Sequence, residues 1–262
     1  NLLQRVNTSF SSYLKSQIIK NDRKNLGVFI NYRTLKFTDN RATEPSINSR
    51  VNYSDSFLNQ LIQTTTFYEN NSGSIAQQEF TFLEVDAGRG LYMWNDYNNN
   101  NIQELQEFEI ATFSDLAKYV KIFLPNQIFI RTYQNKLSQT LTFNGNVWQN
   151  ETGFKKFLSK FYNQTSLIID KKITRNSNTF EWNPFSIPDK DLIGLNTNFR
   201  NSLFLNKGKQ KNSVTYTYNS SALKNVLNFG SQENYIKSHQ LQYVHLVQKF
   251  WLFQLQTNTS SV

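Results

Sequence analysis

The sequence contains no cysteine, so disulfide bridges, thiolate metal sites and a cysteine nucleophile are all excluded. Glycine and proline are scarce as well, with 9 and 4 residues in a chain of 262, which leaves asparagine and serine to form most of the turns. No run of 18 or more apolar residues occurs, and this excludes a transmembrane helix. It does not exclude transmembrane β-strands, because apolar and polar residues alternate in them.

Aromatic residues make up 15% of the chain and hydrophobic residues 38%, which is enough apolar material for a folded protein. The net charge is +9, a value that suits nucleic acid or an anionic membrane surface. The lysines and arginines are dispersed, however, and their one short cluster, at residues 207–211, is typical of a solvated turn between two strands. We therefore expect no nucleic-acid partner.

Alternation of apolar and polar residues is the main structural signal. In residues 26–34, for example, the even positions begin with Leu26, Val28 and Ile30 while the odd positions include Gly27 and Asn31, and the same pattern returns at 47–53, 137–143, 198–205 and 213–218. Two further strands are expected at 235–247 and 250–257. The pattern predicts antiparallel strands with one polar face.

Strands of this length and alternation, with tryptophans near their expected ends, are typical of an outer-membrane β-barrel. The segment Thr257–Val262 ends the chain without a terminal aromatic residue, so we expect a partial barrel whose pattern continues beyond Val262. The predicted fold is therefore all-β, with barrel strands in residues 1–69 and 126–262 and a small inserted calcium-loop subdomain in residues 70–125. A short amphipathic helix is expected near residues 153–162, either packed on the core or lying at a membrane interface.

Residues 96–107 carry oxygen ligands at the spacing of an EF-hand calcium loop. Asparagine replaces the usual glycine at the sixth position, Asn101, and is the next best residue for a left-handed turn. The spacing predicts a structural calcium ion, with an asparagine-rich turn as the alternative. The expected ligands are Asp96, Asn98, Asn100, the carbonyl of Ile102, Glu104 and Glu107.

Several short blocks resemble a region of large outer-membrane β-barrel proteins of the Bacteroidota. The most specific block runs from Trp94 to Glu107, and segments 64–69, 88–92, 124–126 and 199–206 are also similar. The resemblance covers about residues 20–258. It implies a bacterial outer-membrane or cell-surface protein, and a non-enzymatic subunit of a complex for protein export or outer-membrane assembly. Its partners would then be outer-membrane lipid and other protein subunits.

Two other functions stay open. The first is a soluble cell-surface β-sandwich that binds glycan or protein through its aromatic side chains. The second is a hydrolase in which carboxylates such as Glu104 and Glu107 serve as acid and base, although no catalytic constellation is evident in the sequence.

Overall fold

The computed structural model describes residues 7–38, 43–176, 180–186, 190–209, 211–227, 230–248 and 250–261. The chain forms two compact units, one made of Asn1–Gly73, Thr132–Asn225 and Gln232–Val262, the other of Ser74–Arg131 and Val226–Ser231. The sequence placed the insertion at residues 70–125, which overlaps the segment Ser74–Arg131 of the second unit but differs from it at both ends. The fold is all-β with antiparallel strands, as predicted.

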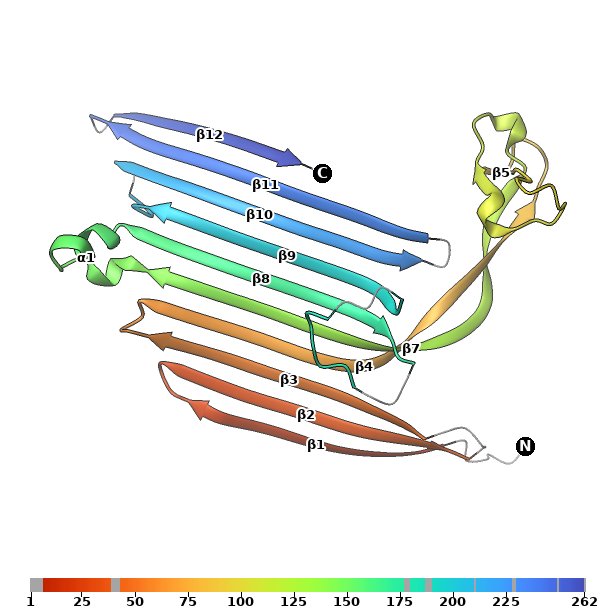
Figure 1. The fold of residues 1–262 in the computed structure, drawn as a ribbon, viewed down its shortest axis with the longest axis horizontal. Helices are drawn as coiled ribbons and strands as arrows, with labels where there is room; N and C mark the ends of the chain where they lie inside the picture. Colours follow the sequence, from red (N-terminus) through yellow and green to blue (C-terminus); the bar gives the residue numbers. More distant parts are fainter. Residues whose placement is uncertain are drawn as a thin grey trace. The chain divides into compact units, whose positions relative to one another are not determined.

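Ten strands of the sheet follow each other in chain order, so that each pairs with the next one along the path (Figure 1). This order is the simplest result of antiparallel strands joined by short turns. Among the described residues the path begins at β1 and ends at β12, and these two strands do not pair with each other. The strands are β1 (Asn7–Lys20), β2 (Lys24–Phe37), β3 (Glu44–Phe57), β4 (Ile62–Glu84), β7 (Tyr119–Asn144), β8 (Phe161–Thr174), β9 (Leu192–Leu205), β10 (Asn212–Leu227), β11 (Gly230–Val247) and β12 (Trp251–Ser261).

The strand register in the first unit sorts the side chains onto two different faces. Directly opposed residues share a face, so Val28 and Val51 lie together, as do Leu167 and Phe199. We call their side the apolar face; it carries, among others, Leu26, Val28, Ile30, Val51, Tyr53, Leu137, Leu141, Leu167, Ile169, Phe199, Leu203, Tyr216 and Leu255. The opposite side is the polar face; it carries, among others, Lys15, Asn31, Arg50, Asn52, Glu69, Lys136, Ser138, Asp170, Asn198, Arg200, Asn219 and Gln256.

Charged side chains on the apolar face flank a stretch without charge. In β2 this stretch spans nine residues, 26–34, between Lys24 and Lys36. In β8, β10 and β11 it is bounded at one end by Lys171, Lys224 and Lys237 and at the other by the end of the strand. Polar residues within it bond to each other: Gln139 contacts Thr64 and Thr66, and Asn163 bonds to Asn201 at 3.3 Å. On the polar face, by contrast, charges such as Arg50 and Arg200 occupy mid-strand positions.

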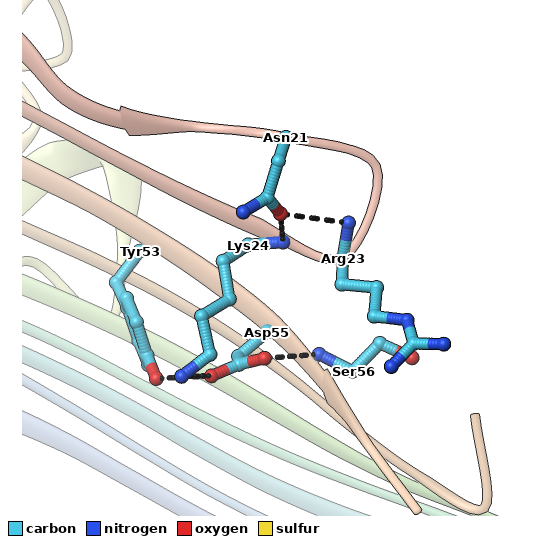
Figure 2. Close-up of polar contacts among 6 residues, drawn as sticks. All are labelled: Asn21, Arg23, Lys24, Tyr53, Asp55 and Ser56. Atoms are coloured by element: carbon cyan, nitrogen blue, oxygen red, sulfur yellow. Dashed lines mark hydrogen bonds and ion pairs between the residues drawn. The ribbon is translucent and has the colours of Figure 1, made fainter. Parts of the chain in front are cut away.

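Figure 2 shows the polar contacts around Asp55 and the β1–β2 turn. The Lys24 Nζ and the Tyr53 hydroxyl both contact Oδ2 of Asp55, at 2.9 and 2.8 Å, while the backbone N–H of Ser56 donates to Oδ1 at 2.7 Å. The Asn21 side chain accepts from the backbone N–H groups of Arg23 and Lys24 and so shapes the turn. The Asp55 carboxylate is 3% exposed, and these three donors compensate its burial.

The connections lie along the two sides of the sheet at which its strands begin and end, and we call these sides edges. We call one the α1 edge: it holds the turns at 21–23, 58–61, 206–211 and 248–250, and the segment between β7 and β8 with η3 (Gly145–Trp148) and helix α1 (Gly153–Leu158). Helix α1 covers the first part of the stretch expected to be helical, because Phe161 already pairs with Leu205 in β9. The other is the insertion edge, where residues 85–118 connect β4 to β7 and residues 175–191 connect β8 to β9. No helix in the described part of the chain combines the length and the apolar composition needed to cross a membrane.

Gly145 should be essential for the α1 edge, because a Cβ atom there would lie 2.1 Å from the Leu158 carbonyl oxygen and 2.6 Å from that of Phe161. Both neighbours are backbone atoms, so the segment would have to move. We expect Gly145→Ala to lower the free energy of unfolding by roughly 1–3 kcal/mol. Denaturant unfolding should show this loss but almost none for Gly194→Ala, whose Cβ would meet only the Asn225 side chain at 3.6 Å and a carbonyl at 3.9 Å. Equal stabilities of the two variants would contradict the packing described.

Candidate functional site

The predicted ion loop connects a short hairpin in the second unit. Strands β5 (Tyr92–Trp94) and β6 (Phe108–Ile110) pair through three residues each, with Trp94 opposite Phe108. The backbone N–H of Asn95 donates to the Glu107 carbonyl at 2.9 Å, which continues the ladder by one bond. Because a hairpin this short is only marginally stable by itself, its order depends on the loop between the strands and on the side chains packed beneath it.

The first half of the loop turns its side-chain oxygens inward onto its own backbone. The Asp96 carboxylate accepts from the N–H groups of Asn100, at 3.1 Å, and Asn101, at 2.8 Å. Oδ1 of Asn98 accepts from Asn100 at 3.0 Å, and Oδ1 of Asn100 from Ile102 at 2.7 Å. Asn101 has φ 58°, the left-handed conformation that favours glycine at this position of such a loop.

Glu107 ends the loop in the short helix η1 (Leu105–Glu107) and is 1% exposed. Its Oε2 accepts from the indole N–H of Trp94 at 2.8 Å and from the backbone N–H of Glu104 at 3.3 Å. Its Oε1 is buried and has no hydrogen-bond partner among the described residues. A carboxylate removed from water in this way is costly unless something compensates its charge.

The other predicted ligands lie in the same loop with different partners. Oε2 of Glu104 accepts from the side-chain amides of Asn98, at 3.2 Å, and Gln106, at 2.7 Å. Ile102 is exposed. Within the described ranges, no three or more His, Cys, Asp or Glu side chains gather closely enough to hold a metal by themselves. Half of the predicted ligands are amide or carbonyl oxygens, so the loop is not built from acidic groups alone.

An aromatic cluster packs beneath the hairpin. The rings of Phe82 and Phe108 stack with centroids 4.1 Å apart, and Tyr92 and Tyr119 meet this pair edge-on at 5.0 Å. Gln103 in the loop donates to the Tyr119 hydroxyl at 3.0 Å, and burial raises the pKa of this phenol. The loop and the cluster therefore form one packed structure. The sequence analysis did not find the hydrogen bond between Trp94 and Glu107.

A second candidate feature belongs to the first unit. Residues 180–186, which we call the strap, cross the apolar face near the insertion edge (Figure 1). The Glu181 carbonyl accepts from Asn70 at 2.7 Å and from Asn135 at 2.9 Å, and the Tyr68 hydroxyl donates to the Trp182 carbonyl. Phe180 packs on the small hydrophobic core made by Tyr133, Ile173 and Leu192.

Lys171 holds the strap from below. This side chain is fully buried, and its ammonium donates to the carbonyl oxygens of Asn183, at 2.6 Å, and Ser186, at 2.7 Å. Asn70 and Asn135 are fully buried as well. The strap therefore supplies backbone acceptors to a polar patch that would otherwise interrupt the apolar face.

Replacing Lys171 should release the strap. Lys171→Met keeps the length of the side chain but removes two hydrogen bonds from a charged donor to the carbonyl oxygens of Asn183 and Ser186, each worth about 1.5–3 kcal/mol. We expect amide hydrogen exchange in residues 180–186 to become at least tenfold faster. Lys172→Met is the matched control, because Lys172 lies on the opposite face beside Gln134. Unchanged exchange in the Lys171 variant would show that the strap is held by other contacts.

Comparison with known proteins identifies no relative of this chain. No family model matches it, and no curated protein and no solved structure matches it either. Its resemblance to outer-membrane proteins of the Bacteroidota therefore rests on the sequence blocks alone, and its function has to be inferred from the two faces of the sheet and from the loop.

Proposed function

We propose that the sheet of the first unit is part of the wall of an outer-membrane β-barrel, with its apolar face toward lipid. The observation that carries this proposal is the uncharged stretch on the apolar face, flanked by charges such as Lys24, Asp55 and Lys171. Nine residues at about 3.3 Å each, tilted by about 40°, rise roughly 23 Å, close to the apolar band of such barrels, about 25 Å tall.

The distribution of polar groups supports the same orientation. The polar face carries mid-strand charges, some of them paired, such as Arg50 with Glu69 at 2.9 Å and Lys136 with Asp170 at 3.7 Å. A water-filled barrel interior accommodates such groups, whereas a lipid-facing surface does not.

The connections favour this proposal too, since outer-membrane barrels have short turns on the periplasmic side and longer loops outside. Four of the five connections at the α1 edge have six residues or fewer, while the insertion and the strap segment both leave the opposite edge. The insertion edge would then face the cell exterior. At that edge the strap covers Asn70, Asn135 and Lys171, so that these polar groups would not contact lipid.

The exposed apolar side chains of the last strand in the path indicate that the sheet needs a partner. Trp251, Phe253 and Leu255 of β12, the last strand of the path, are all more than 60% exposed. Lipid and further strands are the surroundings that would cover this surface. We infer a non-enzymatic subunit of a cell-envelope complex for protein export or outer-membrane assembly.

The alternative functions explain less of the structure. A soluble β-sandwich binding glycan or protein would require a second layer against the apolar face, and the strap covers only a small part of this face in the described residues. The hydrolase alternative draws no support from Glu104 and Glu107, because the Glu107 carboxylate is buried against Trp94.

Two substitutions in β8 distinguish these proposals. Leu167 lies on the apolar face and Ile168 on the polar face, and both are aliphatic. An arginine in the middle of a lipid-facing surface costs about 2–4 kcal/mol. We therefore expect Leu167→Arg to reduce strongly the amount of protein that stays in carbonate-washed membranes, while Ile168→Arg stays at the wild-type level.

Release of the wild-type protein from membranes by carbonate without detergent would overturn the proposal and favour the soluble sandwich. Equal retention of both arginine variants would show that the apolar face does not contact lipid.

A further inference from the structure

We propose that residues 96–107 bind one calcium ion, and that this ion keeps the β5–β6 hairpin closed. The inference concerns the second unit alone and is independent of the membrane proposal. Its starting point is Glu107, whose carboxylate is 1% exposed and receives only two N–H donors, both at one oxygen.

The unsatisfied oxygen of Glu107 points to a missing positive group. In the described part of the chain, neither a hydrogen-bond donor to Oε1 nor an ion pair to this carboxylate is found. A buried carboxylate with a free oxygen destabilises the fold unless a cation compensates its charge. The bond from Glu104 N–H holds the carboxylate against the end of the loop, at the position where an EF-hand loop places its bidentate ligand.

Calcium fits this position better than other cations. The loop offers oxygen atoms only: the carboxylates of Asp96 and Glu107, the amide oxygens of Asn98 and Asn100, and the carbonyl of Ile102. A set of six or more oxygens in a flexible loop suits calcium, whereas magnesium requires stricter octahedral geometry and zinc prefers nitrogen or sulfur. Glu104, at the ninth position of the loop, would act through a water molecule or as a second nearby charge.

The hairpin explains what the ion would do. Strands of three residues do not hold a long loop closed by themselves, and the charge of Glu107 opposes closure as long as it is uncompensated. An ion bound by both Asp96 and Glu107 would join the two ends of the loop and compensate the negative charge of Glu107. The indole N–H of Trp94 would then couple the ion to the aromatic cluster of Phe82, Tyr92, Phe108 and Tyr119.

The test uses the full chain in mild detergent, with calcium chloride as the probe. Titration calorimetry should give one site with a dissociation constant on the order of 10⁻⁵ to 10⁻³ M, and magnesium chloride should bind more weakly. Hydrogen exchange in residues 91–110 should slow at least tenfold when calcium replaces a chelator. The rest of the chain should keep its exchange rates.

Two variants make the test specific. Glu107→Gln has nearly the same shape but lacks the charge, and it should lose at least tenfold in calcium affinity together with the calcium-dependent protection. Glu109→Gln is the matched control: Glu109 lies in the same hairpin, is exposed and bonds to the Tyr97 hydroxyl at 2.6 Å, so binding should be unchanged. Failure of the wild type to bind 10 mM calcium, or wild-type binding by Glu107→Gln, would overturn the proposal. Binding without any change in hydrogen exchange would overturn the role in hairpin closure.

Discussion

The antiparallel register of the sheet is the constraint on which most of this structure depends. The pairs Val28–Val51 and Leu167–Phe199 place apolar side chains together on one face of the sheet. The residues next to them along each strand point to the opposite, polar face. A slip of one residue in any strand would bring side chains such as Arg50 or Arg200 to the apolar face. One-sided alternation therefore fixes the register, and the register decides which surface can meet lipid.

Buried charged groups are treated differently in the two units. In the first unit, the Lys171 ammonium donates to two carbonyl oxygens of the strap, and Asp55 finds three donors beside the β1–β2 turn. In the second unit Glu107 has donors for only one of its oxygens. Oδ1 of Asn70 and Oδ1 of Asn135 also have no hydrogen-bond partner among the described residues, but these amides are neutral. Glu107 is a carboxylate, and its charge is what calls for a cation from outside the chain.

Period-two alternation in the sequence predicted segments of seven of the ten strands in the path, for example 26–34 in β2 and 198–205 in β9, because these strands have one polar face. It identified no segment in β1, β4 or β8. The ion loop was found by the spacing of its oxygen atoms, a local property. The Trp94–Glu107 bond and the strap were not found. Both depend on which side chains meet after the strands have paired. Nothing in the residues around Lys171 indicates that the strap, residues 180–186, will cover this side chain. Barrel closure and the bound ion remain proposals, since both depend on partners beyond the chain described.

The most direct test is a cysteine scan along β8, which is straightforward because the chain contains no cysteine of its own. Residues 161–170 are replaced one at a time, and the variants in intact membranes are treated with a charged, water-soluble maleimide. If the apolar face meets lipid and the polar face meets water, labelling should alternate with a period of two, strong at Gln164, Ser166 and Ile168 and weak at Thr165, Leu167 and Ile169. Uniform labelling of both sets, or stronger labelling of the odd-numbered set, would contradict a lipid-facing apolar surface.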